Sequence, residues 1–146
     1  VVGRALEALR ESFLEAQRGH PDGLHEVEAI GRAYIDYARE RPHYFDACAR
    51  YQAHEVVKDD TNEAACRYAG HRVHEVIVDS LNRGVADGSI RADLGNPYVT
   101  ALSLWAFSHG VILIGANKGS QIEQQGTTVP EFISHAFGLA LRSLKP

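Results

Sequence analysis

Histidine and cysteine side chains are the groups of this 146-residue sequence best suited to chemistry, and the histidines first suggest a metal site. His71 and His74 lie one helical turn apart, and the pair His54-Glu55 lies earlier in the chain. A zinc site takes three or four ligands, and two histidines at this spacing are too few. His71 also shares its helix face with Glu75, in a pattern typical of a solvated surface. The sequence also lacks the two Glu-x-x-His pairs of a ferritin-like di-iron centre. We therefore expect no native metal and no cofactor.

The two cysteines raise the question of a thiol enzyme. Cys48 or Cys66 beside a histidine would make a nucleophile and its general base. Nothing in the sequence brings such a pair together, and buried cysteines are more often small apolar side chains. The segment from Gly84 to Gly88 is no phosphate-binding loop, because no strand precedes it and no lysine follows it. We expect a protein without catalytic activity, with a small all-α enzyme as an alternative.

An uncharged segment of eighteen residues, Val99 to Ala116, contains the most informative pair of side chains. Trp105 and His109 are four residues apart, so they share one face of a helix with Leu102 and Ile112. Such a face would form the wall of a ligand pocket with one polar group in an apolar surround. The alternative is a packed core in which the histidine is hydrogen-bonded to protein.

The length of this segment raises two further possibilities. Eighteen residues span about 27 Å of helix, which is close to what a membrane span needs. His109 and Gly110 lie in its middle and charged amphipathic helices surround it, so we expect a buried helix and no membrane. In a globin His109 would bind haem, but only 37 residues follow it, including a polar loop at 117–128. These are too few for the globin fold.

The segments around this helix are helical as well. Asp22, Asn96 and Thr128 are suited to cap helix starts, Asp60 with Glu63 has the form of a capping box, and Pro42 suits a first helical position. No segment alternates apolar and polar residues convincingly. The sequence therefore predicts an all-α fold of six helices, at 1–18, 22–40, 42–51, 60 to 84 or 88, 97–116 and 128–144.

Composition narrows the class of protein. The length suits one domain. A net charge of −4 excludes the general basic surface that binds nucleic-acid phosphates. Two cysteines make no disulfide framework and no signal peptide is evident, so we expect a cytoplasmic protein. The first residue is Val1, from which we expect the sequence to be part of a longer chain.

The last two long helices are apolar on more than one face, whereas the first four have one apolar stripe each. Two such helices from each of two chains would form a four-helix interface about a two-fold axis. We therefore expect a homodimer. The residues that we assign to its interface are Phe107, Gly110, Ile114, Phe132, Ala136, Leu139 and Ala140.

The order of helices and three short motifs together resemble the C-terminal regulatory domain of TetR-type transcriptional regulators. The motifs are the turn Gly88 to Leu94, the segment Leu104 to Gly110, and Ala33 to Ala38 before Arg41-Pro42. The resemblance implies a linker helix at 1–18, leading from an N-terminal helix-turn-helix domain that is absent here, and a ligand-binding and dimerisation domain at 19–146. It also implies that DNA is bound only through the absent domain, and that the whole protein is a repressor whose operator affinity a small molecule modulates.

The expected effector is largely apolar or aromatic, with one or two hydrogen-bonding groups. Aromatic residues on the two helices at 22–40 and 42–51, Tyr44 among them, would face the Trp105 and His109 side of the central helix. A dimerisation module with a filled core and no ligand is the alternative. The predicted ligand-binding residues are Tyr34, Tyr37, Phe45, Cys48, Tyr51, Cys66, Val73, His74, Ile77, Leu102, Trp105, His109 and Ile112.

Overall fold

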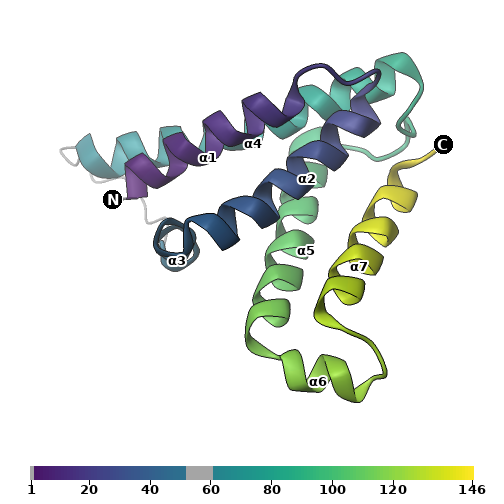
Figure 1. Ribbon diagram of the computed structural model, residues 1–146. Coiled ribbons are helices and arrows are strands. Elements are labelled where there is room, and N and C mark those ends of the chain that lie inside the picture. The colour runs from purple at the N-terminus through teal and green to yellow at the C-terminus, as the bar shows by residue number, and fades with distance from the viewer. Residues whose placement is uncertain (1, 52–60) are drawn as a thin grey trace.

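The computed structural model describes residues 2–51 and 61–146, and in this part of the chain it contains helices and no strands (Figure 1). The all-α class is confirmed. A short helix, α6, interrupts the predicted polar loop at 117–128, because Ile122 is buried and anchors one helical turn there. The helices are α1 (Val2–Gln17), α2 (Gly23–Glu40), α3 (Pro42–Arg50), α4 (Thr61–Asp87), α5 (Pro97–Asn117), α6 (Gly119–Gln124) and α7 (Val129–Leu144).

The helix starts follow the local sequence. Asp22, Asn96 and Thr128 each accept a hydrogen bond from a backbone N–H two or three residues later, as predicted. Proline opens α3, α5 and α7 within the first helical turn, where its missing N–H costs nothing. The predicted cap at Asp60 lies outside the described residues.

The helices form two connected groups (Figure 1). α1 and α4 lie side by side and α2 packs against both of them, so that these three helices enclose most of the core. α5 descends from the end of α4 and α7 returns antiparallel to it, with α6 joining their far ends. α2 therefore connects the two groups, since it contacts α1 and α4 on one side and α5 and α7 on the other.

The start of α2 is held tightly against the end of α4. A Cβ atom added to Gly23 would lie 2.1 Å from the backbone nitrogen of Gly84, so the two helices touch through their backbones. The Gly23 N–H donates to the Asp87 carboxylate at 2.8 Å, and the Leu24 N–H donates to the Ser89 hydroxyl at 3.1 Å. These bonds satisfy N–H groups that a helix start leaves without intrahelical partners.

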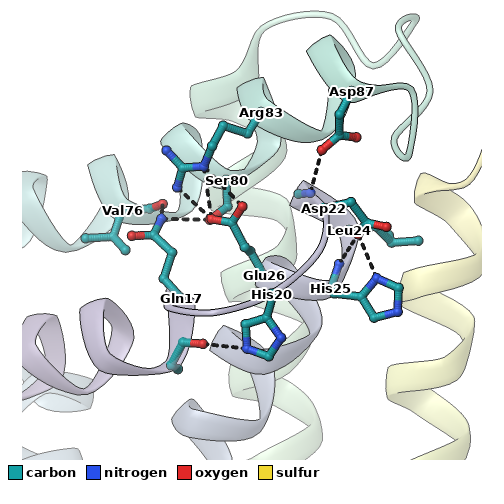
Figure 2. A network of polar contacts seen from close by, with 12 residues as sticks. Gln17, His20, Asp22, Leu24, His25, Glu26, Val76, Ser80, Arg83 and Asp87 are labelled. Carbon is teal, nitrogen blue, oxygen red and sulfur yellow. Dashed lines mark hydrogen bonds and ion pairs between the residues drawn. The ribbon is translucent and has the colours of Figure 1, made fainter.

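A buried polar network lies next to this crossing (Figure 2). The Glu26 carboxylate accepts three hydrogen bonds from Arg83, the shortest at 2.7 Å, and a fourth from the Ser80 hydroxyl at 3.1 Å. The Gln17 amide donates to the same hydroxyl at 2.8 Å and to the Val76 carbonyl at 3.2 Å. The network therefore joins the end of α1 to α2 and α4 at one point.

The turn that follows α4 is hydrogen-bonded to the C-terminal end of α7. Gly88 has a φ of 85°, the left-handed conformation that favours glycine at a helix end. Ile90 is buried and donates its N–H to the Gly84 carbonyl at 3.0 Å. The Arg91 N–H then donates to the Leu144 carbonyl at 2.8 Å, which joins the end of α7 to the turn before α5.

α5 leaves much of its apolar surface uncovered. Among the described helices it is the one that is long and apolar enough to cross a membrane by length and composition. Of its most apolar stretch of 18 residues, 11% is buried within the chain. It nevertheless packs against α2, α4, α6 and α7 as an element of one helical domain. The large apolar side chains exposed on α5 are Tyr98, Val99, Leu102, Trp105, Phe107, Leu113 and Ile114, and Leu139 is exposed on α7.

Candidate ligand-binding site

A cavity of about 870 Å³ lies between α2, α5 and α7. Its lining is mainly apolar, with Ile35 from α2, Ile112 from α5 and Phe137 from α7 among the contributors. Phe13 and Ile77 extend the wall toward α1 and α4. Volume and lining both fall within the range of small-molecule sites.

Two polar side chains of the wall are bonded to each other. The Trp105 indole N–H donates to the Tyr34 hydroxyl oxygen at 3.0 Å, and that hydroxyl lies 2.8 Å from Nδ1 of His109. An indole N–H can only donate, so the Tyr34 oxygen is the acceptor from Trp105 and its proton is available to a neutral His109. Tyr34 and Trp105 line the cavity, while His109 lies behind them.

Aromatic rings enclose this hydrogen-bonded group. Phe45 of α3 stacks on His109 with ring centroids 5.1 Å apart, and the His74 ring meets Trp105 edge-on at 5.6 Å. Nδ1 of His74 is buried without a hydrogen-bond partner. Burial lowers the pKa of both His109 and His74, with the neighbouring His71 as a smaller cause for His74. Both rings are therefore held in the neutral form near pH 7.

The shift in the pKa of Tyr34 likewise keeps its hydroxyl group neutral. Burial raises the pKa of Tyr34 to about 12, and the bond from Trp105 opposes this only in part. The inner wall is therefore uncharged at physiological pH, which suits an apolar ligand body.

The structure places four of the predicted ligand-binding residues in the cavity wall. They are Tyr34, Ile77, Trp105 and Ile112. Phe45, His74 and His109 support this wall from behind through the ring contacts described above.

Three other predicted residues lie toward α1 and the core. The Tyr37 hydroxyl is buried and donates to the Ala5 carbonyl of α1 at 2.8 Å. Cys48 is half-buried, and burial raises the pKa of its thiol, which makes it a weak nucleophile. Val73 is buried in the core. None of the three lines the cavity.

The remaining predicted residues lie at the periphery. Tyr51 follows α3 and Cys66 lies in the first half of α4, both partly buried. Leu102 is 48% exposed, because the face of α5 that it shares with Trp105 becomes buried only nearer the C-terminal end of the helix, at Ile112. These three residues also lie outside the cavity wall.

Sequence reasoning missed the wall that α7 provides. Val129, Ile133, Phe137 and Leu141 line the cavity at helical spacing. The signal was the second apolar face of α7, for which we predicted no ligand-binding residue from the sequence. On α2, Gly31 lies directly under Phe137, since an added Cβ would meet that ring at 2.9 Å.

Some of the predicted interface residues are exposed on the chain surface, and others are buried within the chain. Phe107, Ile114 and Leu139 are exposed large side chains, and open space lies beside Gly110. Ala136 is buried in its own chain and Phe132 is partly buried. Ala140 lines the cavity and also a second groove beside Phe107 and Leu139, so it lies between the two faces of α7.

The histidines and acids that the structure describes do not form a cluster suited to a metal. Within the described residues, no three histidine, cysteine or acidic side chains are grouped closely enough to hold an ion. His71 is bonded to Glu75 at 3.0 Å, and both side chains are about half-exposed. His54-Glu55, the other pair considered for a metal site in the sequence, lies outside the described residues.

Comparisons with known proteins agree with this architecture. No curated protein matches the chain. A solved structure of a protein with unknown function from Rhodococcus sp. RHA1 is similar in fold, with a TM-score of 0.78 and 19% sequence identity, over 99% of this chain and 71% of that chain. A family model described as "Tetracyclin repressor-like, C-terminal domain" matches residues 27–136, well over half of the chain. The chain therefore belongs to the tetracycline repressor-like C-terminal domain family.

Proposed function

We propose that this domain binds a small, largely apolar effector in the cavity between α2, α5 and α7, and that it dimerises as part of a non-catalytic cytoplasmic transcriptional regulator. The observation that carries the proposal is the cavity itself, which is apolar, of ligand size and bordered by the bonded pair Tyr34 and Trp105. Residues 1–18 would link it to a DNA-binding domain, and repression would be the output.

The path from the cavity to that linker runs through α2. Tyr34 lines the cavity, and Tyr37, one turn later on α2, donates its hydroxyl proton to the Ala5 carbonyl of α1. A ligand that binds one position of α2 more tightly than another would bias the position of α1 by that difference in affinity. The start of α2 is held by the contacts of Gly23, so its far end would be the part that moves.

We expect the uncharged fluorophore N-phenylnaphthylamine to bind the wild-type domain saturably, with one site per chain. Ser108 of α5 lines the cavity, and Ser108→Phe places a ring inside it. This variant should weaken binding at least about tenfold, because the ring takes the place of the probe. A fluorescence titration measures both affinities.

Ser120→Phe is the matched control, since Ser120 is exposed on α6 and lies outside the cavity wall. It should bind the probe as the wild type does. Circular dichroism would establish that both variants are folded. Binding that never saturates, or that Ser108→Phe leaves unchanged, would favour the dimerisation module with a filled core.

For dimerisation, the exposed apolar faces of α5 and α7 are the surface that a second copy would cover. Leu139 is 48% exposed on α7, and Leu139→Glu should leave a monomer, because the dimer would have to bury an unpaired charge. Sedimentation velocity measures the mass in solution. Val85→Glu on α4 is the control, since Val85 is equally apolar and 41% exposed on another surface. A Leu139→Glu dimer as stable as the wild type would refute this interface.

A further inference from the structure

We infer that the effector is an amphiphilic organic anion, whose apolar body fills the cavity while its anionic group binds Arg39 at the edge. This inference rests on the proposed function, because it specifies the chemistry of the ligand in that cavity. It follows from where the charges of the wall lie.

The charged residues of the wall all come from one helix. Among the described residues that line the cavity they are Glu28, Arg32 and Arg39 of α2. The lining residues of α5 and α7 carry no charge, and the polar groups there are the Ser108 and Ser134 hydroxyls and the Trp105 indole N–H. A ligand therefore meets charge on the α2 edge alone and an apolar surface on the other two helices.

The two arginines are compensated to different extents. Arg32 is bonded to Glu28 at 2.6 Å, and Glu28 itself lines the cavity, so this pair offers the ligand both signs of charge. Arg39 is bonded to Asp36, which lies outside the wall. The wall thus has a net positive charge, and Arg39 is its source.

The bond between Arg39 and Asp36 leaves the guanidinium available to a ligand. Their side chains are 72% and 53% exposed, and they lie three residues apart on one helix. Such exposed pairs contribute little to stability because water screens them. A guanidinium has five N–H donors, so Arg39 can bind a carboxylate or a similar oxyanion while it keeps its contact to Asp36.

The part of the wall formed by Tyr34 and Trp105 does not compete for an anion. The Trp105 indole N–H is used by Tyr34, and the Tyr34 hydroxyl is bonded to His109 on its other side. His109 and His74 are neutral near pH 7, since burial lowers the pKa of each. The apolar body of the ligand therefore suits the wall beside Tyr34 and Trp105, and the anionic group suits Arg39.

The test compares three ligands with one alkyl chain and different head groups: octanoate, octanol and octylamine. Each displaces N-phenylnaphthylamine from the wild-type domain, and the intrinsic fluorescence of Trp105, the single tryptophan of the sequence, reports binding independently. We expect octanoate to bind about tenfold more tightly than octanol, and octylamine to bind most weakly.

The variant Arg39→Gln should reduce the preference for octanoate over octanol to about twofold or less, while octanol binds as before. Arg67→Gln removes the same charge from an exposed position on α4 outside the wall and should retain the full preference. Equal affinities of octanoate and octanol in the wild type would overturn the inference and leave the proposed function standing. A preference that survives Arg39→Gln, or that is lost in Arg32→Gln instead, would also overturn it. Absence of probe binding would refute the proposed function as well.

Discussion

Replacement of Gly23 by alanine is expected to destabilise the domain by about 3 kcal/mol or more, which is at the upper end of overpacking effects. The added Cβ would lie 2.1 Å from the nitrogen and 2.3 Å from Cα of Gly84, and 2.5 Å from the Ser80 carbonyl oxygen. All three are backbone atoms, so no side chain can rotate away to make room. Urea denaturation followed by circular dichroism measures the loss.

Gly70→Ala is the matched control, because Gly70 lies inside α4 with nothing within 4 Å of an added Cβ. Alanine is favoured over glycine in a helix interior, so this variant should gain about 0.5–1 kcal/mol. Similar stabilities of the two variants would contradict the backbone contact between α2 and α4.

The second large effect is expected for Arg83→Met, which should cost about 3 kcal/mol. The variant leaves the Glu26 carboxylate without its three bonds from Arg83 at a site where the Glu26 side chain is 8% exposed. An uncompensated buried charge costs more than the pair contributes when intact. The same denaturation experiment gives the change in free energy of unfolding.

A double-mutant cycle separates the charge from the packing. Glu26→Leu combined with Arg83→Met removes both charges, and the double variant should be more stable than Arg83→Met alone. The Ser80 hydroxyl then retains its bond from the Gln17 amide. If the double variant is the less stable of the two, the cost of Arg83→Met comes from lost packing, and the buried carboxylate does not explain it.

Local sequence signals predicted the helices well. Asp22, Asn96 and Thr128 cap the helices that they were expected to cap, because a cap involves residues only two or three positions apart. The short α6 was missed, since its burial depends on Ile122 and its sequence is otherwise polar.

The candidate site was predicted in part, for a physical reason. Trp105 and His109 share a helix face, which is a local property, but their common partner Tyr34 lies 71 and 75 residues away. No local pattern reports such a contact. The sequence likewise indicates that α7 is apolar on two faces, but only the arrangement in space shows which of them faces the cavity.

The bond from the Arg91 N–H to the Leu144 carbonyl would affect how the proposed ligand reaches the cavity. It holds the C-terminal end of α7 against the turn before α5, so we expect any outward movement of α7 to be smallest at that end. At the opposite end, near α6, the atoms nearest to a Cβ added at Gly115 belong to the aliphatic side chains of Ile133 and Val129. Such apolar contacts separate more readily than hydrogen-bonded backbones. We therefore expect the proposed effector to enter at the α6 end, with the pinned end as the pivot.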